Sequence, residues 1–129
     1  PRMISLIAAG KKPELYGNGA NVRDWIHVDD HNDGVWAILE HGVVGRTYLL
    51  GADNQRSNLE VVRALLRIMG RPEDFVSFIA DRPGHDLRYA IDASATEAEL
   101  GWKPVRGNFE ERLAETVEWY LGRLNLPKD

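Results

Sequence analysis

The sequence predicts an α/β fold, or an α+β variant of it, for a chain of 129 residues. Short runs rich in β-branched and aromatic residues alternate along the chain with amphipathic segments that carry helix-capping residues. Glycine-containing turns separate these segments, and neither an internal repeat nor a low-complexity stretch interrupts them. The length is that of one domain, so we expect residues 1–129 to form a single region.

Helices are predicted from start and stop signals that lie close together in the sequence. The apolar segment 3–9 ends at Gly10, which suits a helix C-terminus. Asp29 or Asp30 is expected to cap a second helix that runs to Glu40. The spacing of apolar residues predicts the buried side of that helix. We expect this side to contain Val35, Ile38 and Leu39.

The same kind of signal predicts three further helices. A capping box formed by Ser57 and Glu60 opens the first of them. Ser94 begins a short helix that Gly101 ends, and the pattern 108–111 caps the last one. One face of this last helix carries Leu113, Val117, Tyr120, Leu121 and Leu124.

Strands are predicted where β-branched and aromatic residues cluster or alternate with polar ones. The expected segments are 15–16, 22–28, 47–50, 75–79 and 89–91. The first leads into the tight loop 17–19, because glycine and asparagine accept positive φ angles. That loop lacks the third glycine of a dinucleotide-binding fingerprint and precedes a strand, so it does not predict a dinucleotide site.

Composition excludes several classes of protein. Sixteen basic against 20 acidic residues give a net charge of −4, which argues against a general nucleic-acid-binding protein. The chain has no cysteine, which rules out disulfides and thiolate zinc sites and fits a cytoplasmic protein. No apolar run reaches transmembrane length, so we expect no membrane partner. Because the sequence opens on Pro1 without an initiator methionine, we expect it to be part of a longer protein.

Two arginine-containing loops are the strongest functional signal. In the segment 82–88 two guanidiniums and an imidazole fall within seven residues, and such groups bind anions. Pro83 and Gly84 give that loop a defined shape. A second loop, 16–25, carries Arg23. Two such loops far apart in the sequence predict one diphosphate-bearing ligand held between them.

Simpler structural interpretations stand beside these functional ones. Arg23 could pair with a neighbouring aspartate at the surface, and the loop 81–86 could be held by its own carboxylates alone. Asn58 follows the cap of a helix, where it could serve the cap or, beside free amides, an anion. His27 and His31 are four residues apart, but the first ends an expected strand and the second begins a helix, so no metal site is expected.

Longer motifs point to a family. Two broadly shared motifs are 15–19 and 22–31, and the narrower ones are 57–62, 81–92, 99–104 and 116–120. Together they resemble the C-terminal part of the extended short-chain dehydrogenases/reductases and, within that superfamily, the dTDP-glucose 4,6-dehydratases. The likeness covers nearly the whole chain. It implies the α/β sugar-nucleotide-binding part of such an enzyme, without the N-terminal Rossmann core.

The resemblance implies a particular reaction and division of labour. Enzymes of this family are NAD-dependent lyases, dimeric at full length, that convert dTDP-glucose to dTDP-4-keto-6-deoxyglucose. None of the tyrosines here has a lysine four positions later, so the family's tyrosine–lysine pair is missing. We therefore expect the catalytic groups and most NAD contacts in an absent N-terminal half, and a chain that is inactive alone. An epimerase or decarboxylase of the same superfamily, or a noncatalytic ligand-binding or interaction module, is the alternative.

The resemblance also implies which residues bind the dTDP-sugar. Arg23 and Arg82 match the arginines that clamp the diphosphate, and Asn58 matches an asparagine near the phosphates. The residues expected beside the nucleotide are Arg2, Met3, Tyr16 and His85. Arg2 stands where the family has lysine, so we expect main-chain contacts there. The resemblance implies no catalytic residue, metal ligand or cofactor-binding residue in this chain.

Overall fold

A computed structural model describes residues 1–105 and 108–123, which form two compact units. The first unit comprises Pro1–Asn21, Ser57–Leu87 and the described part of Asn108–Asp129. The second comprises Val22–Arg56 and the described part of Arg88–Gly107. Each unit is therefore assembled from segments that are distant in the sequence. None of the described helices is long and apolar enough to cross a lipid bilayer.

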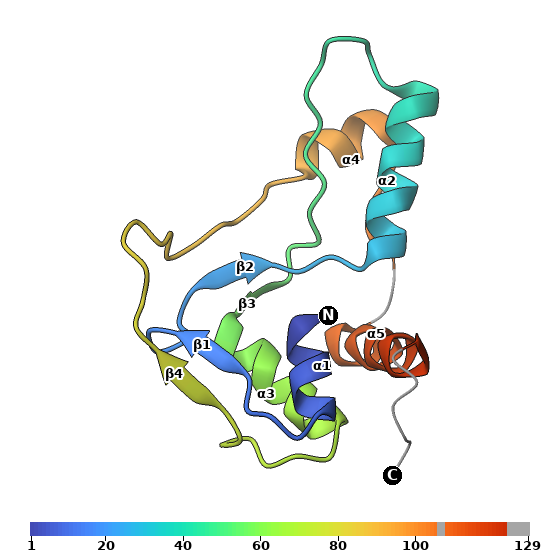
Figure 1. Ribbon diagram of the computed structural model, residues 1–129. Coiled ribbons are helices and arrows are strands. Elements are labelled where there is room, and N and C mark those ends of the chain that lie inside the picture. Colours follow the sequence, from blue (N-terminus) through green and yellow to red (C-terminus); the bar gives the residue numbers. More distant parts are fainter. Residues whose placement is uncertain (106–107, 124–129) are drawn as a thin grey trace. The chain divides into compact units, whose positions relative to one another are not determined.

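The described part of the first unit combines helices with a small parallel sheet (Figure 1). Its elements are α1 (Arg2–Ala8), β1 (Glu14–Tyr16), α3 (Asn58–Ile68), β4 (Ser77–Ile79) and α5 (Phe109–Arg123). β1 and β4 pair in parallel, with Glu14 opposite Ser77 and Tyr16 opposite Ile79. Because parallel strands end at the same edge of a sheet, the loops after Tyr16 and Ile79 leave from the same place.

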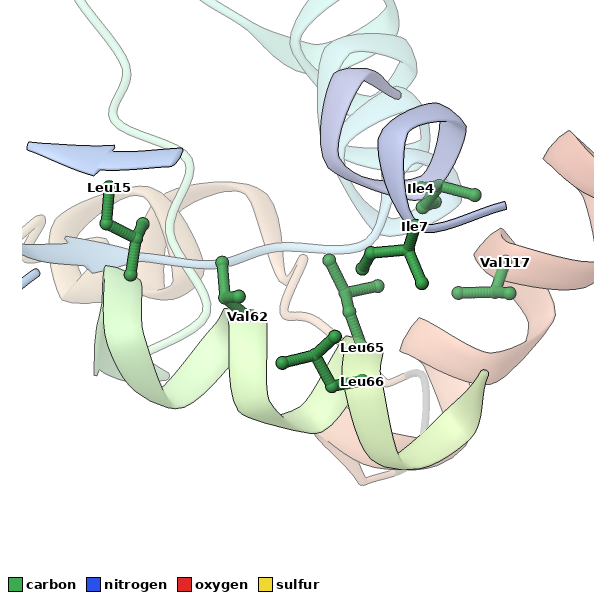
Figure 2. Packing of buried hydrophobic residues seen from close by; sticks show 7 residues of the cluster. All are labelled: Ile4, Ile7, Leu15, Val62, Leu65, Leu66 and Val117. Carbon is green, nitrogen blue, oxygen red and sulfur yellow. The ribbon is translucent and has the colours of Figure 1, made fainter. Parts of the chain in front are cut away.

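The core of the first unit lies where α1, α3 and α5 meet (Figure 2). The buried cluster consists of Ile4, Ile7, Leu15, Val62, Leu65, Leu66 and Val117. The three members from α3 are spaced three and one residues apart, so they lie on one face of that helix. Leu113, Tyr120 and Leu121 pack against the cluster from α5, as predicted, whereas Leu124 lies outside the described residues.

Three of the helix ends that local signals predict are confirmed, namely the starts of α3 and α5 and the helix end at Gly101. Ser57 Oγ accepts the N–H of Glu60 at 3.2 Å, and the Glu60 carboxylate accepts the N–H of Ser57 at 2.7 Å. Asn108 Oδ1 accepts the N–H of Glu111 at 3.1 Å. Gly101 ends its helix with a φ of 65°. Each of these contacts spans at most three residues, which is why the sequence alone reveals them.

The second unit contains a second small sheet and two helices. Its elements are β2 (Val22–Asp24), α2 (Val28–His41), β3 (Gln55–Ser57) and α4 (Ser94–Leu100). β2 and β3 pair with each other, and β3 ends where the chain re-enters the first unit. The pairing of β2 with a polar segment was not predicted, because no apolar pattern marks β3.

The expected N-cap of α2 is wrong by two or three residues. The helix begins at Val28, and its N-cap is His27, whose Nδ1 accepts the N–H of Asp29 at 3.2 Å. The aspartates therefore occupy the first turn rather than the cap position. Their negative charges interact favourably there with the positive end of the helix dipole.

The expected buried face of α2 is only partly right, because Ile38 is half-buried but Val35 and Leu39 are exposed. Val35 and Leu39 are 39% and 71% exposed, whereas Asp30 and Gly34 are buried. A Cβ atom on Gly34 would lie only 2.7 Å from Leu50 Cδ2. The absence of a side chain at Gly34 therefore lets Leu50 approach the helix closely, and the face of α2 that carries Gly34 is the buried one. Apolar spacing cannot reveal such an approach, because it depends on the partner rather than on the helix itself.

Three strand predictions need correction. The strand expected at 22–28 stops at Asp24, and the segments 47–50 and 89–91 contain no strand. The N–H of Leu49 donates instead to Thr96 Oγ1 at 3.0 Å. Beside the segment 89–91, Arg88 forms an isolated bridge with Val22, and the N–H of Tyr89 donates to Val22 O at 3.1 Å. High β-propensity does not make a strand where a side chain, rather than a neighbouring strand, takes the backbone N–H.

Candidate functional site

The loop that follows β4 holds a buried imidazole against a carboxylate. His85 Nδ1 lies 2.6 Å from Asp81 Oδ1, so the imidazole N–H donates to the carboxylate. The His85 side chain is only 6% exposed although it belongs to a loop. Gly84, with a φ of 70°, allows the chain to turn back between the two residues. The Asp81 carboxylate therefore fixes the orientation of His85.

Residues that follow β1 complete this cluster. The ring of Tyr16 meets the His85 ring edge to face, with centroids 5.8 Å apart and planes at 83°. The N–H of Gly17 donates to Ile79 O at 2.9 Å, and a Cβ on Gly17 would lie 3.3 Å from Asp81 Oδ2. The parallel pairing of β1 and β4 thus brings the predicted residues Tyr16 and His85 together.

Arg82 supplies the positive charge of this cluster. Its backbone N–H donates to Asp81 Oδ1 at 2.9 Å, and its carbonyl accepts the N–H of His85 at 3.3 Å, while its side chain is exposed. A guanidinium on a backbone fixed in this way is suited to forked hydrogen bonds with phosphate oxygens.

Asn58 begins α3 beside the loop 17–21. The N–H of Asn58 donates to Asn21 O at 2.9 Å, and the N–H of Leu59 donates to Gly19 O at 3.0 Å. With Glu60 bonded to Ser57 Oγ, the first three amides of α3 are all occupied. The interpretation of this helix end as a set of free amides for an anion is therefore wrong, and only the Asn58 side chain stays a candidate.

Arg2 and Met3 lie at the start of α1. Arg2 forms an exposed ion pair with Glu14 at 3.6 Å. The side chain of Met3 packs against the hydrophobic core, so a nucleotide contact from this residue would have to come from its main chain.

Arg23 belongs to the second unit, in β2, whereas the other six predicted binding residues belong to the first. Its guanidinium carbon lies 4.3 Å from the centroid of the Tyr89 ring, and its Nη1 donates to Val22 O at 2.6 Å. The contact between Tyr89 and this arginine is not predictable from the sequence, because the two residues are far apart along the chain.

The described residues offer no cluster of three or more His, Asp or Glu side chains that could hold a metal ion. One ring nitrogen of His27 is already used to cap α2. The loop 17–19 joins two strands, as predicted, and so is not the strand-to-helix turn that the pyrophosphate of a dinucleotide requires. These residues do not fit the phosphate-binding loop for NAD.

We expect Asp81 to contribute to stability in a pH-dependent way. The hydrogen bond from His85, aided by the N–H of Arg82, holds the pKa of Asp81 below its ordinary value of 3.8. The stabilisation is therefore present above the unfolded-state pKa and lost as the pH falls through the lower folded-state pKa. Urea denaturation from about pH 5 down to about pH 2 should show a smaller loss of unfolding free energy for Asp81→Asn than for the wild type. Parallel losses in the two proteins would contradict this.

Comparisons with known proteins place the chain in a family. A family model described as GDP-mannose 4,6 dehydratase matches residues 1–116. The chain belongs to this dehydratase family. Among family relatives, the dTDP-glucose 4,6-dehydratase of Mycolicibacterium smegmatis is 56% identical over 120 residues, which are 93% of this chain and 36% of that protein. The dTDP-glucose 4,6-dehydratase of Escherichia coli is 41% identical over 132 residues, again 36% of that protein.

Solved structures of the family share the fold. DesIV, a dTDP-glucose 4,6-dehydratase from Streptomyces venezuelae solved with NAD and TYD bound, matches with a TM-score of 0.91 at 38% identity. The match covers 99% of this chain and 39% of DesIV. The predicted resemblance is thus confirmed: the chain is a homologue of dTDP-glucose 4,6-dehydratase with a mixed α/β fold. It spans little more than a third of the length of these relatives.

Proposed function

We propose that this chain is the substrate-binding region of an NAD-dependent dTDP-glucose 4,6-dehydratase and binds a dTDP-sugar. The observation that carries the proposal is the cluster of Tyr16, Asp81, Arg82 and His85 at the shared edge of β1 and β4. It combines an aromatic ring, an oriented imidazole and an exposed guanidinium, which suit a nucleoside diphosphate. The 56% identity to a dTDP-glucose 4,6-dehydratase supports the choice of ligand.

Individual roles follow from the family motifs. Arg82 and Arg23 bind the diphosphate, with the Asn58 side chain nearby. His85 lies beside the nucleotide, and Tyr16 packs near the base and deoxyribose. The nucleotide contacts assigned to the start of α1 are those of Arg2 and, through its main chain, Met3.

The proposed reaction of the whole enzyme converts dTDP-glucose to dTDP-4-keto-6-deoxyglucose. NAD oxidises the sugar at C4, water is lost across C5 and C6, and the hydride returns to C6. In this proposal the proton-transfer groups and most NAD contacts come from the part of the relatives that this chain does not span. The 129 residues alone are then inactive, and the complete enzyme is a cytoplasmic homodimer.

Calorimetric titration with dTDP tests the proposal. We expect Arg82→Ala and Arg23→Ala each to lose about 1.5–3 kcal/mol, or roughly 10- to 150-fold in affinity, because each removes a charge-assisted hydrogen bond. Arg71→Ala is the control, since Arg71 is an exposed arginine of the first unit outside the binding motifs. Equal affinities for the wild type and all three variants would reject the proposal.

A second candidate is a nucleotide-sugar epimerase. The UDP-glucose 4-epimerase of Bifidobacterium longum matches with a TM-score of 0.79 at 31% identity, over 95% of this chain and 39% of that protein. Competition between dTDP, UDP and GDP separates the candidates. Preference for dTDP supports the dehydratase, and preference for UDP supports the epimerase.

A further inference from the structure

Arg23 is held on two sides within the second unit. Its guanidinium lies over the Tyr89 ring, with 4.3 Å between the guanidinium carbon and the ring centroid. One of its nitrogens, Nη1, donates to Val22 O at 2.6 Å. These two contacts restrict the terminal torsions of a side chain that would otherwise sample many rotamers.

Tyr89 is itself fixed by the backbone that holds Arg23. Its N–H donates to Val22 O at 3.1 Å, so one carbonyl accepts from both residues. The preceding residue, Arg88, forms a parallel bridge with Val22 and donates through Nε to Gln55 Oε1 at 3.1 Å. The ring therefore stands on a segment that is anchored to both β2 and β3.

A ring beneath a guanidinium does not itself use the N–H donors that bind an anion. A guanidinium is planar, so a ring uses its face while its N–H donors point outward in the plane. Forked hydrogen bonds to phosphate oxygens are made in that plane, so a ring and a phosphate can be bound at the same time. A cation whose direction is set before the ligand arrives loses less conformational freedom on binding.

We propose that Tyr89 is a positioning residue for Arg23 and raises the affinity of this chain for a nucleoside diphosphate. The inference rests on the proposed function, in which Arg23 contacts the diphosphate. Tyr89 acts through Arg23 and need not touch the ligand. The ring, and not the hydroxyl, is the part that matters.

A double-mutant cycle with dTDP as the probe tests the inference. Tyr89→Leu should weaken binding about two- to sixfold, as expected for the loss of a cation–π contact at a partly exposed site. Tyr89→Phe keeps the ring and should bind like the wild type. In an Arg23→Ala background, Tyr89→Leu should cause no further loss. A ligand-free readout is the NMR shift of the Arg23 Hδ and Hε protons, which the ring should move upfield in wild type and Tyr89→Phe but not in Tyr89→Leu.

The outcomes separate the inference from the proposed function. Unchanged affinity in Tyr89→Leu, with a loss in Arg23→Ala, would overturn the inference and leave the proposed function standing. So would an equal effect of Tyr89→Leu with and without Arg23, or a loss in Tyr89→Phe as large as that in Tyr89→Leu. Failure of the wild-type chain to bind dTDP would overturn the proposed function itself.

Discussion

Leu66→Ala is expected to lower the free energy of unfolding of the first unit by about 2–5 kcal/mol. Leu66 is 0% exposed and belongs to the cluster in which α1, α3 and α5 meet (Figure 2). Removing its branched end forfeits the transfer free energy of those methyl groups and leaves a cavity that close-packed neighbours fill only partly. Urea denaturation followed by far-ultraviolet circular dichroism measures the loss.

Leu87→Ala is the matched control for this change. Leu87 belongs to the same unit but is 68% exposed, so its truncation should change the free energy of unfolding by no more than about 0.5 kcal/mol. Similar losses of unfolding free energy in the two variants would contradict the placement of Leu66 in the core of the first unit. The comparison matters for function, because β1 and α3, which lead to Tyr16 and Asn58, both contribute to this core.

Gly19→Ala is expected to be the most damaging change in the loop between β1 and β2. Gly19 is buried with a φ of 74°, and a Cβ there would lie 3.0 Å from both Leu15 Cδ1 and Leu59 Cβ. The left-handed backbone costs alanine about 1–2 kcal/mol, and the crowding adds about 1–3 kcal/mol. Relief of the crowding would also displace Gly19 O, which accepts the N–H of Leu59 at 3.0 Å.

Gly10→Ala isolates the backbone contribution. Gly10 has a similar φ of 68°, but nothing lies within 4 Å of its missing Cβ. Only the cost of the left-handed conformation, about 1–2 kcal/mol, is expected there. Thermal and urea denaturation of both variants should show the larger loss for Gly19→Ala. Equal losses would show that Leu15 and Leu59 move aside without cost.

The sequence predicted the residue types of the candidate site but not most of the contacts that these residues make. The cationic and aromatic residues were recognised as binding candidates, because guanidinium, imidazole and phenol groups indicate anion or nucleotide binding by residue type alone. Of their partners, Asp81 was expected only as a simpler structural alternative, and the contact of Tyr89 with Arg23 was not predicted. The occupation of the first amides of α3 by the carbonyls of Asn21 and Gly19 was also missed. Each of these depends on which atoms approach, which residue type alone does not specify.

The sequence by itself determined the helix ends that carry local caps, the residue types of the binding loops and membership of the dehydratase family. A capping box or a left-handed glycine acts over three or four residues, so its signal lies within one short window. Only the tertiary structure decided that Val22–Asp24 pairs with Gln55–Ser57, that 47–50 forms no strand and that α2 buries Asp30 and Gly34. Strand pairing and burial join residues that are distant along the chain, so the stabilising partner of each segment exists only once the chain has folded.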